Sequence, residues 1–600
     1  MDTRTSPTRL RLERVRDALQ RHGLDALLVP SSDPHLSEYL PARWQAREWL
    51  SGFSGSMGTL VVTRGQAALF ADSRYWTQAE GELAGSGIAL VKIASGTSPE
   101  HLAWLAREMQ PGQTLAVDGQ VIGLAAALAL RNALAAAGVA LRTDIDLFAE
   151  AWDDRPALPS APVAEHLAPH APQSRTDKLA LVRAAMAAHG ATQHFVSTLD
   201  DIAWIFNLRG GDVSFNPVFL AHALIGMDAA TLFVADGKID AGLRARLAAD
   251  GVALAPYAGA GPALAALPAG TTLLVDPKRI TLGLREQVAA DVRVVEAINP
   301  STLAKSRKSD AEAAHVREAM EQDGAAMCEF YAWFEAALAR GEHLTEIIVG
   351  ERLAAARARQ PDLRGTSFAT IAGFNANGAL PHYRATPETN AVIEGDGLLL
   401  IDSGGQYLGG TTDITRVWPI GTVSAACKRD VTLVLKGTLA LSRTRFPRGT
   451  LSPMLDAIAR APLWAESLDY GHGTGHGVGY FLNVHEGPQS ISKTIPDAHM
   501  AMEPGMITSI EPGLYRVGQW GVRIENLVLN VPAAGDGCGE FLAFETLTLC
   551  PIDTRCIERS LLRADEIAWL NAYHAEVRRR LAPRVGGDAL AWLETRTQPI

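Results

Sequence analysis

The sequence lacks any long hydrophobic run. Its longest apolar stretches, such as residues 124–130, fall far short of the roughly 18–20 residues that a membrane-spanning helix needs. The N-terminal segment mixes Arg with Asp and Glu and contains no apolar stretch of the kind found in secretory signals. We therefore expect no membrane partner, and we interpret residues 8–22 as an amphipathic helix.

Cysteine is scarce and unpaired. The 600-residue chain has no CxxC motif, and its five cysteines are Cys328, Cys427, Cys538, Cys550 and Cys556. Secreted disulfide frameworks and structural zinc clusters need denser and more regular spacing. We expect mostly buried thiols in a reducing compartment.

An excess of positive charge is also missing. The chain has 55 Lys and Arg against 66 Asp and Glu, which gives a formal net charge of −11. Nucleic-acid binding depends on a broad positive field, so we expect no nucleic-acid partner. The sequence also has no HExxH, GxSxG or GxxxxGK[ST] motif, which argues against zincins, serine hydrolases and P-loop enzymes.

The length predicts several domains, because one hydrophobic core rarely serves a chain of 600 residues. Alternating predicted helices and strands indicate an α/β domain over residues 1–160, ending in a proline-rich linker at 156–172. The pattern then restarts over 161–305. Residues 11–23 align with 178–190 at a constant offset. This favours a duplicated domain over chance similarity between two amphipathic helices.

The second half of the chain predicts a third domain over residues 306–538. Ser309 can cap a long helix at its start, and the unusual polar residues lie between 370 and 530. A C-terminal extension follows over 539–600, with a predicted strand and a helix over 564–581. The expected fold class is therefore α/β (α+β).

Two aspartates flank a glycine-rich connection between apolar strands. Asp402 ends the first strand and Asp413 opens the second, so an antiparallel pairing brings both carboxylates together. Adjacent buried carboxylates repel each other unless a cation lies between them. A metal site is one interpretation, and a pair of ordinary turn residues is the other.

Histidines concentrate in the glycine-rich segment 471–488, where they are His472, His476 and His485. A single histidine is usually a surface or core residue, but three among glycines favour a binding site. Glycines there allow the backbone and the rings to approach a bound group closely.

Two glutamates complete the polar set. Glu511 follows a β-branched run, and Glu525 stands two residues after Arg523 in an alternating strand. Arg523 could satisfy Glu525 as a structural ion pair. With both aspartates and one imidazole the set carries a formal charge of −4, which two divalent cations would neutralise. Oxygen-rich ligands of this kind suit Mn²⁺, Co²⁺, Fe²⁺ or Zn²⁺, and the implied chemistry is hydrolysis.

These phrases, DSGGQYLGGTTDITR, HGTGHGVG, NVHEGP and SIEPGLY, resemble the creatinase/methionine aminopeptidase superfamily with its "pita-bread" fold. Within it, nearly the whole chain is similar to the long, three-domain form of Xaa-Pro aminopeptidase. The resemblance implies two creatinase-like N-terminal domains, a pita-bread catalytic domain, and two metal ions bound by Asp402, Asp413, His476, Glu511 and Glu525.

The same resemblance implies individual roles. Asp402 binds one ion, His476 and Glu511 bind the other, and Asp413 and Glu525 bridge both. Glu511 also accepts a proton from the attacking water, while His382, His472 and His485 orient the substrate and stabilise the tetrahedral intermediate. The family further implies a cytoplasmic homodimer that uses Mn²⁺, with Trp464 near the dimer contact. Co²⁺ or Zn²⁺ are the alternatives.

The expected function is removal of the first residue from short peptides that have proline in second position. One alternative is a prolidase-type dipeptidase, which shares the five ligands. A metal-free relative of creatinase type is another. A catalytically inactive pita-bread binding module is the alternative outside the enzymes. The five intact ligands argue against the last two.

Overall fold

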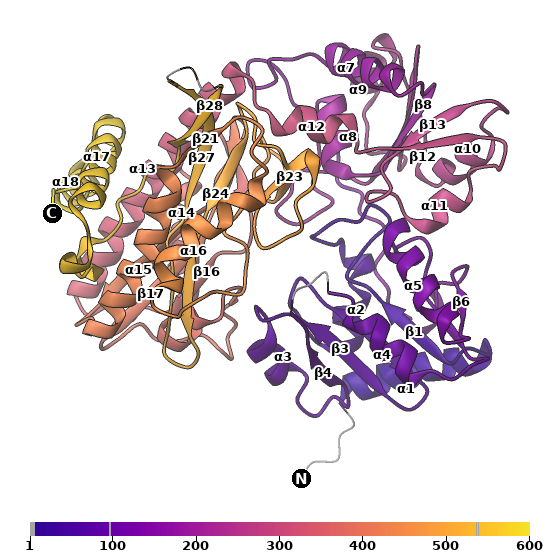
Figure 1. Ribbon diagram of the computed structural model, residues 1–600, viewed down its shortest axis with the longest axis horizontal. Coiled ribbons are helices and arrows are strands. Elements are labelled where there is room, and N and C mark those ends of the chain that lie inside the picture. The colour runs from indigo at the N-terminus through magenta and orange to yellow at the C-terminus, as the bar shows by residue number, and fades with distance from the viewer. Residues whose placement is uncertain (1–5, 95–97, 536, 538) are drawn as a thin grey trace. The chain divides into compact units, whose positions relative to one another are not determined.

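The computed structural model describes residues 6–94, 98–535, 537 and 539–600 (Figure 1). The chain divides into two compact units, one of residues 1–167 with 173–301 and one of residues 168–172 with 302–600. Across the described residues, no helix combines the length and apolar character needed to span a membrane. Four of the five cysteines are buried free thiols, as expected, and Cys538 lies outside the described residues.

The first unit contains two six-stranded sheets with the same strand order and the same pattern of directions. In each, an antiparallel three-stranded centre is extended by parallel strands, so that β1 and β8 hold equivalent places. The first sheet runs β4 (Ala89–Lys92), β3 (Ala67–Ala71), β2 (Thr59–Thr63), β1 (Ala26–Val29), β5 (Thr114–Ala116), β6 (Ala140–Arg142). The second runs β12 (Val252–Pro256), β11 (Ala230–Val234), β10 (Ala221–Gly226), β8 (Gln193–Val196), β13 (Thr272–Val275), β14 (Arg293–Glu296). The expected duplication is confirmed by this shared topology.

Helices flank both sheets. They are α1 (Pro7–Arg21), α2 (Ala46–Ser51), α3 (Trp76–Glu82), α4 (Glu100–Glu108), α5 (Leu124–Ala136) and α6 (Phe148–Ala151) in the first half, then α7 (Arg175–Ala188), α8 (Leu199–Phe206), α9 (Ala241–Ala249), α10 (Ala260–Ala265) and α11 (Leu282–Glu286). Within the proline-rich segment expected to be a linker, β7 (Ala164–Glu165) pairs with β9 (Leu208–Arg209), so that segment is partly ordered by pairing.

After the short helix α12 (Pro300–Ser306), the second unit contains a 30-residue helix, α13 (Asp310–Ala339), as the sequence predicts. The Ser309 side chain accepts from the Glu312 amide, and Glu312 reaches back to the Ser309 amide, which satisfies two otherwise unpaired N–H groups. Beside α13 pack α14 (Glu346–Arg357) and the C-terminal helices α17 (Ala564–Leu581) and α18 (Gly587–Arg596), the yellow end of the chain in Figure 1. The bounds expected for α17 are confirmed.

The residues expected to bind metal lie in or next to two sheets of this unit. One consists of β16 (Ile371–Phe374), β17 (Gly397–Ser403) and β20 (Ile414–Ile420). The other runs β21 (Arg445–Pro447), β28 (Phe541–Thr546), β27 (Asn526–Ala533), β24 (Ile507–Ile510), β22 (Gly475–Gly477), β23 (Glu486–Ile491). Smaller pairings join β15 (Leu363–Thr366), β18 (Gly405–Tyr407) and β19 (Gly410–Thr411), and join β25 (Gly513–Arg516) to β26 (Trp520–Arg523). Helices α15 (Ala425–Ser442) and α16 (Asp456–Trp464) pack on each other, and α15 packs on β24, β25, β26 and β28.

Candidate metal centre

Asp402 and Asp413 lie on neighbouring antiparallel strands. In the β17–β20 pairing, Asp402 faces Thr415 and Ser403 faces Ile414, so Asp413 lies directly beside the end of β17. Both aspartates are buried. The expected pairing is confirmed, but the connection is longer than a tight turn because it forms β18 and β19. The two carboxylates therefore converge from separate strands.

His476 lies in the short strand β22, and a glycine makes this position possible. A side chain at Gly475 would place its Cβ 1.9 Å from the Ser509 carbonyl oxygen on β24. The His476 Nδ1 lies 3.0 Å from the Gly477 carbonyl, which can only accept, so Nδ1 carries the proton. The Nε2 atom is thereby left to face Asp413 Oδ2 and Glu511 Oε1, each 3.5 Å away.

The two glutamates enter from the ends of strands in the larger sheet. Glu511 directly follows β24, where its amide donates to the Thr474 carbonyl over 2.7 Å, and Ser509 Oγ donates to its Oε1 over 3.3 Å. Glu525 directly precedes β27 and accepts from Thr415 Oγ over 2.7 Å. This hydrogen bond links Glu525, beside the larger sheet, to β20, the strand of the smaller sheet that follows Asp413.

The resulting group has the donors and the charge that a divalent metal needs. The ligand atoms of Asp413, His476 and Glu525 all lie within 4.8 Å of one another. Asp402 Oδ1 is buried and has no hydrogen-bond partner among the described residues. A buried carboxylate oxygen without a donor is costly unless a cation takes that place. The residues therefore fit two divalent cations.

The pKa values show how strongly this group concentrates negative charge. Burial raises the pKa of Asp402 to about 7, although Arg523 opposes the shift. Burial, followed by the neighbouring acids, raises the pKa of Glu525 far above its ordinary value. Burial by itself lowers the pKa of His476, but Asp413 and Glu511 outweigh that effect and raise it to about 9. Burial and the neighbouring carboxylates together account for these shifts.

Arg523 pairs with Asp402, so the alternative that it pairs with Glu525 is wrong. Its Nη2 donates to Asp402 Oδ2 over 2.5 Å. The chain leaves β26 at Arg523 and starts β27 at Asn526, so Arg523 and Glu525 do not share the face of one continuous strand. The guanidinium also donates to the Pro381 carbonyl over 3.3 Å, which brings the segment before His382 to this site.

The histidines expected to contact substrate differ in how clearly the structure relates them to the acids. The ring of His485 lies 4.3 Å from the ring of His476, nearly perpendicular to it. His472 Nε2 lies 2.8 Å from the Tyr515 hydroxyl, which accepts from Arg523 Nη1 over 2.6 Å. His382 is half-buried in the segment after β16, next to the Pro381 carbonyl that Arg523 contacts.

Tyr515 and Thr415 are functional candidates that sequence reasoning missed. Tyr515 links His472 to Arg523, and Thr415 holds Glu525. The sequence could have pointed to these two residues only through their positions. Thr415 stands two residues after Asp413, and Tyr515 follows Glu511 within the same short segment. Neither residue type is unusual there, so only the contacts identify them.

Family models match almost the whole chain. The description "Metallopeptidase family M24" fits residues 314–531, and "C-terminal region of peptidase_M24" fits 540–600. Two models described as "Creatinase/Prolidase N-terminal domain" fit 11–146 and 154–312. The protein is thus an M24-type metallopeptidase with a doubled creatinase N-terminal region.

Full-length relatives narrow this class. A probable Xaa-Pro aminopeptidase P of Chaetomium globosum is 37% identical over 99% of this chain and 100% of its own length. Aminopeptidase P2 of Arabidopsis thaliana is 37% identical over 96% of this chain and 86% of its own. The chain belongs to the Xaa-Pro aminopeptidase P family, and the family expected from the sequence is confirmed.

A solved structure agrees with this assignment. The X-prolyl aminopeptidase from Caenorhabditis elegans, described as a cytosolic enzyme with a di-nuclear active site, is 31% identical. It matches 99% of this chain and 100% of its own with a TM-score of 0.94. The expected fold class, two creatinase-like domains followed by a pita-bread catalytic domain, is confirmed.

Proposed function

We propose that this protein is an Xaa-Pro aminopeptidase, which hydrolyses the bond between the first residue and a proline in second position. The observation that carries the proposal is similarity along the full length of Xaa-Pro aminopeptidase P relatives. Beside it, the buried acids Asp413 and Glu525 lie near His476, whose Nε2 is 3.5 Å from Glu511 Oε1. The prolidase-type dipeptidase, which lacks comparable full-length support here, is the second candidate.

We propose that Asp402 holds one metal ion, that His476 and Glu511 hold the other, and that Asp413 and Glu525 bridge both. The convergence of Asp413, His476 and Glu525 and the unpaired Asp402 Oδ1 support this assignment. Two divalent ions, when bound, lower the pKa of water toward neutrality and stabilise a developing oxyanion. We propose Mn²⁺, with Co²⁺ or Zn²⁺ as alternatives, because oxygen donors dominate the set.

The surrounding side chains have the remaining catalytic roles in this proposal. Burial raises the pKa of Glu511, which suits a carboxylate that takes a proton from water near neutral pH. The hydrogen bond from Ser509 Oγ fixes the Oε1 atom for that transfer. His485 lies against the His476 ring, and with His382 and His472 it would hold the substrate carbonyl and donate to the oxygen that gains charge.

The substrate requirement follows from the chemistry of proline. An Xaa-Pro bond is a tertiary amide with no N–H, so peptidases that use this donor bind it poorly. The leaving proline nitrogen must receive a proton as the bond breaks. The buried acids Asp402, Asp413 and Glu525 and the half-buried Glu511 also attract the free ammonium group of a peptide N-terminus.

Four peptides test the function. Purified protein with Mn²⁺ should cleave Xaa-Pro-Yaa between Xaa and Pro, and it should cleave N-acetylated Xaa-Pro-Yaa poorly. Strong hydrolysis of the dipeptide Xaa-Pro alone would identify a prolidase. Equal kcat/KM on Xaa-Ala-Yaa would remove proline from the function, and no hydrolysis of any peptide would favour an inactive binding module.

The chain organisation and assembly belong to the same proposal. We propose domains at 1–160, 161–305 and 306–538 with an extension at 539–600, supported by the shared topology of the first two sheets. We also propose a cytoplasmic homodimer. Trp464 is the last residue of α16, and it supports a contact surface because 45% of the residue is exposed. Light scattering of wild type and Trp464→Glu would test it.

A further inference from the structure

Arg416 lies inside the catalytic unit, three residues after Asp413 and only 1% exposed. Six acceptors lie within 3.1 Å of its guanidinium nitrogens and share its five N–H groups. They are the carbonyls of Thr415, Glu525, Cys550 and Pro551, the side-chain oxygen of Asn526 and the Tyr573 hydroxyl. None of these six is a carboxylate. A buried cation held by neutral acceptors alone is expensive, so packing alone is a weak reason for it.

The six contacts join two different parts of the unit. The Thr415 carbonyl at 2.9 Å and the Glu525 carbonyl at 2.6 Å belong to the strands that carry the acids. Cys550, Pro551 and Tyr573 belong to the C-terminal segment, Tyr573 on helix α17. One planar side chain thus ties the backbone of a predicted metal ligand to the end of the chain.

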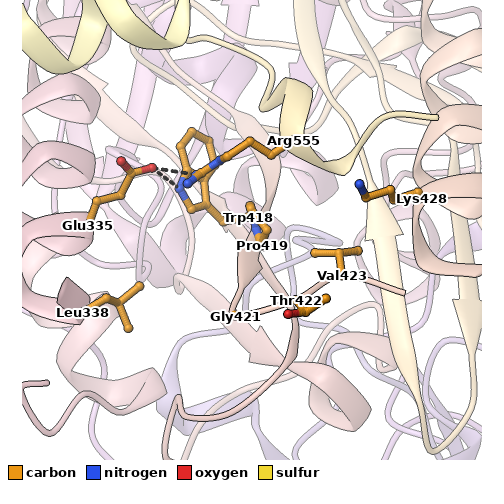
Figure 2. A pocket seen from close by; sticks show the side chains of 9 residues that line it. All are labelled: Glu335, Leu338, Trp418, Pro419, Gly421, Thr422, Val423, Lys428 and Arg555. Atoms are coloured by element: carbon orange, nitrogen blue, oxygen red, sulfur yellow. Dashed lines mark hydrogen bonds and ion pairs between the residues drawn. The ribbon is translucent and has the colours of Figure 1, made fainter. Parts of the chain in front are cut away.

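The C-terminal segment is also linked to β20 at Trp418, two residues after Arg416, through Glu335. Glu335 of α13 accepts from Trp418 Nε1 over 2.9 Å, from Arg555 over 2.7 Å and from Arg596 over 2.6 Å. Figure 2 shows the first two bonds at the edge of a pocket beside Trp418. The Trp418 ring also stacks on Tyr331 at 4.0 Å. Strand β20 is therefore held by this segment at both Arg416 and Trp418.

We propose that Arg416 is a positioning residue, which sets the Glu525 and Asp413 carboxylates by holding their strands against residues 550–573. This inference rests on the proposed metal site and goes beyond it, because it gives the C-terminal segment a part in metal binding. The bond from Thr415 Oγ to Glu525 completes the link, since Arg416 holds the Thr415 carbonyl while the Thr415 hydroxyl holds the carboxylate.

Titration of metal-free protein with Mn²⁺ alone, followed by calorimetry, tests the proposal. Arg416→Lys keeps the charge but cannot reach both groups of acceptors, so the Kd for Mn²⁺ should rise about 10- to 100-fold. Tyr573→Phe removes one acceptor on the C-terminal side and should raise the Kd about threefold, in the same direction. With saturating Mn²⁺, kcat should fall while KM for Xaa-Pro-Yaa stays close to wild type.

A matched control separates positioning from stability. Arg357 is equally buried, but its guanidinium pairs with a carboxylate, Asp323, over 2.7 and 3.1 Å. Arg357→Lys should lower the urea midpoint of unfolding as much as Arg416→Lys and leave the Mn²⁺ Kd unchanged.

The outcomes separate the role of Arg416 from the proposed function. An unchanged Kd in Arg416→Lys and Tyr573→Phe overturns the role of Arg416, as does an equal rise in Arg357→Lys. If Arg416→Lys does not fold, Tyr573→Phe alone decides in the same way. Wild-type protein that binds Mn²⁺ but does not cleave Xaa-Pro-Yaa overturns the proposed function and leaves this inference standing. Wild type that binds none of Mn²⁺, Co²⁺ and Zn²⁺ overturns both.

Discussion

Arg523 donates from Nη2 to Oδ2 of Asp402 over 2.5 Å, and both side chains are buried. The guanidinium occupies one carboxylate oxygen and leaves Oδ1 without a hydrogen-bond partner among the described residues. A carboxylate oriented in this way has one oxygen fixed and one available to a cation. The ion pair thus orients Asp402, which we propose as a metal ligand.

Asp413→Asn should abolish metal binding and turnover. As the proposed bridging ligand, Asp413 would serve both ions, and an amide oxygen is neutral and binds a divalent cation more weakly. Elemental analysis after reconstitution should find two ions per wild-type chain and a large loss in the variant. Activity that survives exhaustive chelation of the wild type would contradict the dinuclear site.

His485→Ala should keep its metals and lose turnover. A lost contact to the transition state typically lowers kcat about 10²- to 10³-fold. Metal content and kcat should be measured on the same preparation. A variant as metal-free as Asp413→Asn would show that His485 belongs with the ligands.

Tyr515→Phe should break the link from His472 to Arg523. A hydrogen bond to a charged group contributes about 1.5–3 kcal/mol, so kcat should fall at least about tenfold with metal content unchanged. The matched control is Tyr331→Phe, because the buried Tyr331 hydroxyl has no hydrogen-bond partner among the described residues. Equal loss of kcat in both variants would remove Tyr515 from the site.

Gly475→Ala should displace His476. The added Cβ would meet the Ser509 carbonyl at 1.9 Å, so β22 must move away from β24, at a cost of about 1–3 kcal/mol in unfolding free energy. Gly365→Ala is the control, since nothing lies within 4 Å of a Cβ there. We expect weaker Mn²⁺ binding only in the Gly475 variant, and equal affinity in both would contradict the close approach.

His574 should make the catalytic unit sensitive to acid. Its Nε2 accepts from the Ile552 amide over 3.1 Å, and burial, with help from Arg416, lowers its pKa to about 4. Between pH 6.5 and 4 the unfolded chain binds a proton that the folded chain does not. The unfolding free energy therefore falls as pH drops through this window, by up to about 3 kcal/mol.

The variant His574→Asn tests this pH dependence because it keeps an acceptor for Ile552 and cannot titrate. Urea denaturation at several pH values should give a flatter dependence for the variant than for the wild type. A difference between the two that is constant from pH 7.5 to 4.5 would show that another group is responsible.

Local sequence determined the elements that need no distant partner. The capping box at Ser309 and the bounds of α17 follow from residues within a few positions of each other. The spacing of Asp402 and Asp413 around glycines implied that their strands pair, because a short connection between two apolar strands permits little else. Acid and imidazole residue types then pointed to a metal before any contact was visible.

Only the tertiary structure decided which side chains meet. The sequence around Arg523 does not show whether its side chain pairs with Asp402 or with Glu525. In the structure β26 ends at Arg523 and β27 starts at Asn526, and the Arg523 side chain pairs with Asp402. Likewise the sequence shows Arg416 only as one charged residue in a strand, yet all its acceptors except the Thr415 carbonyl come from segments more than 100 residues away. Hydrogen bonds depend on position and angle at the scale of an ångström, and such geometry arises only when distant segments pack together.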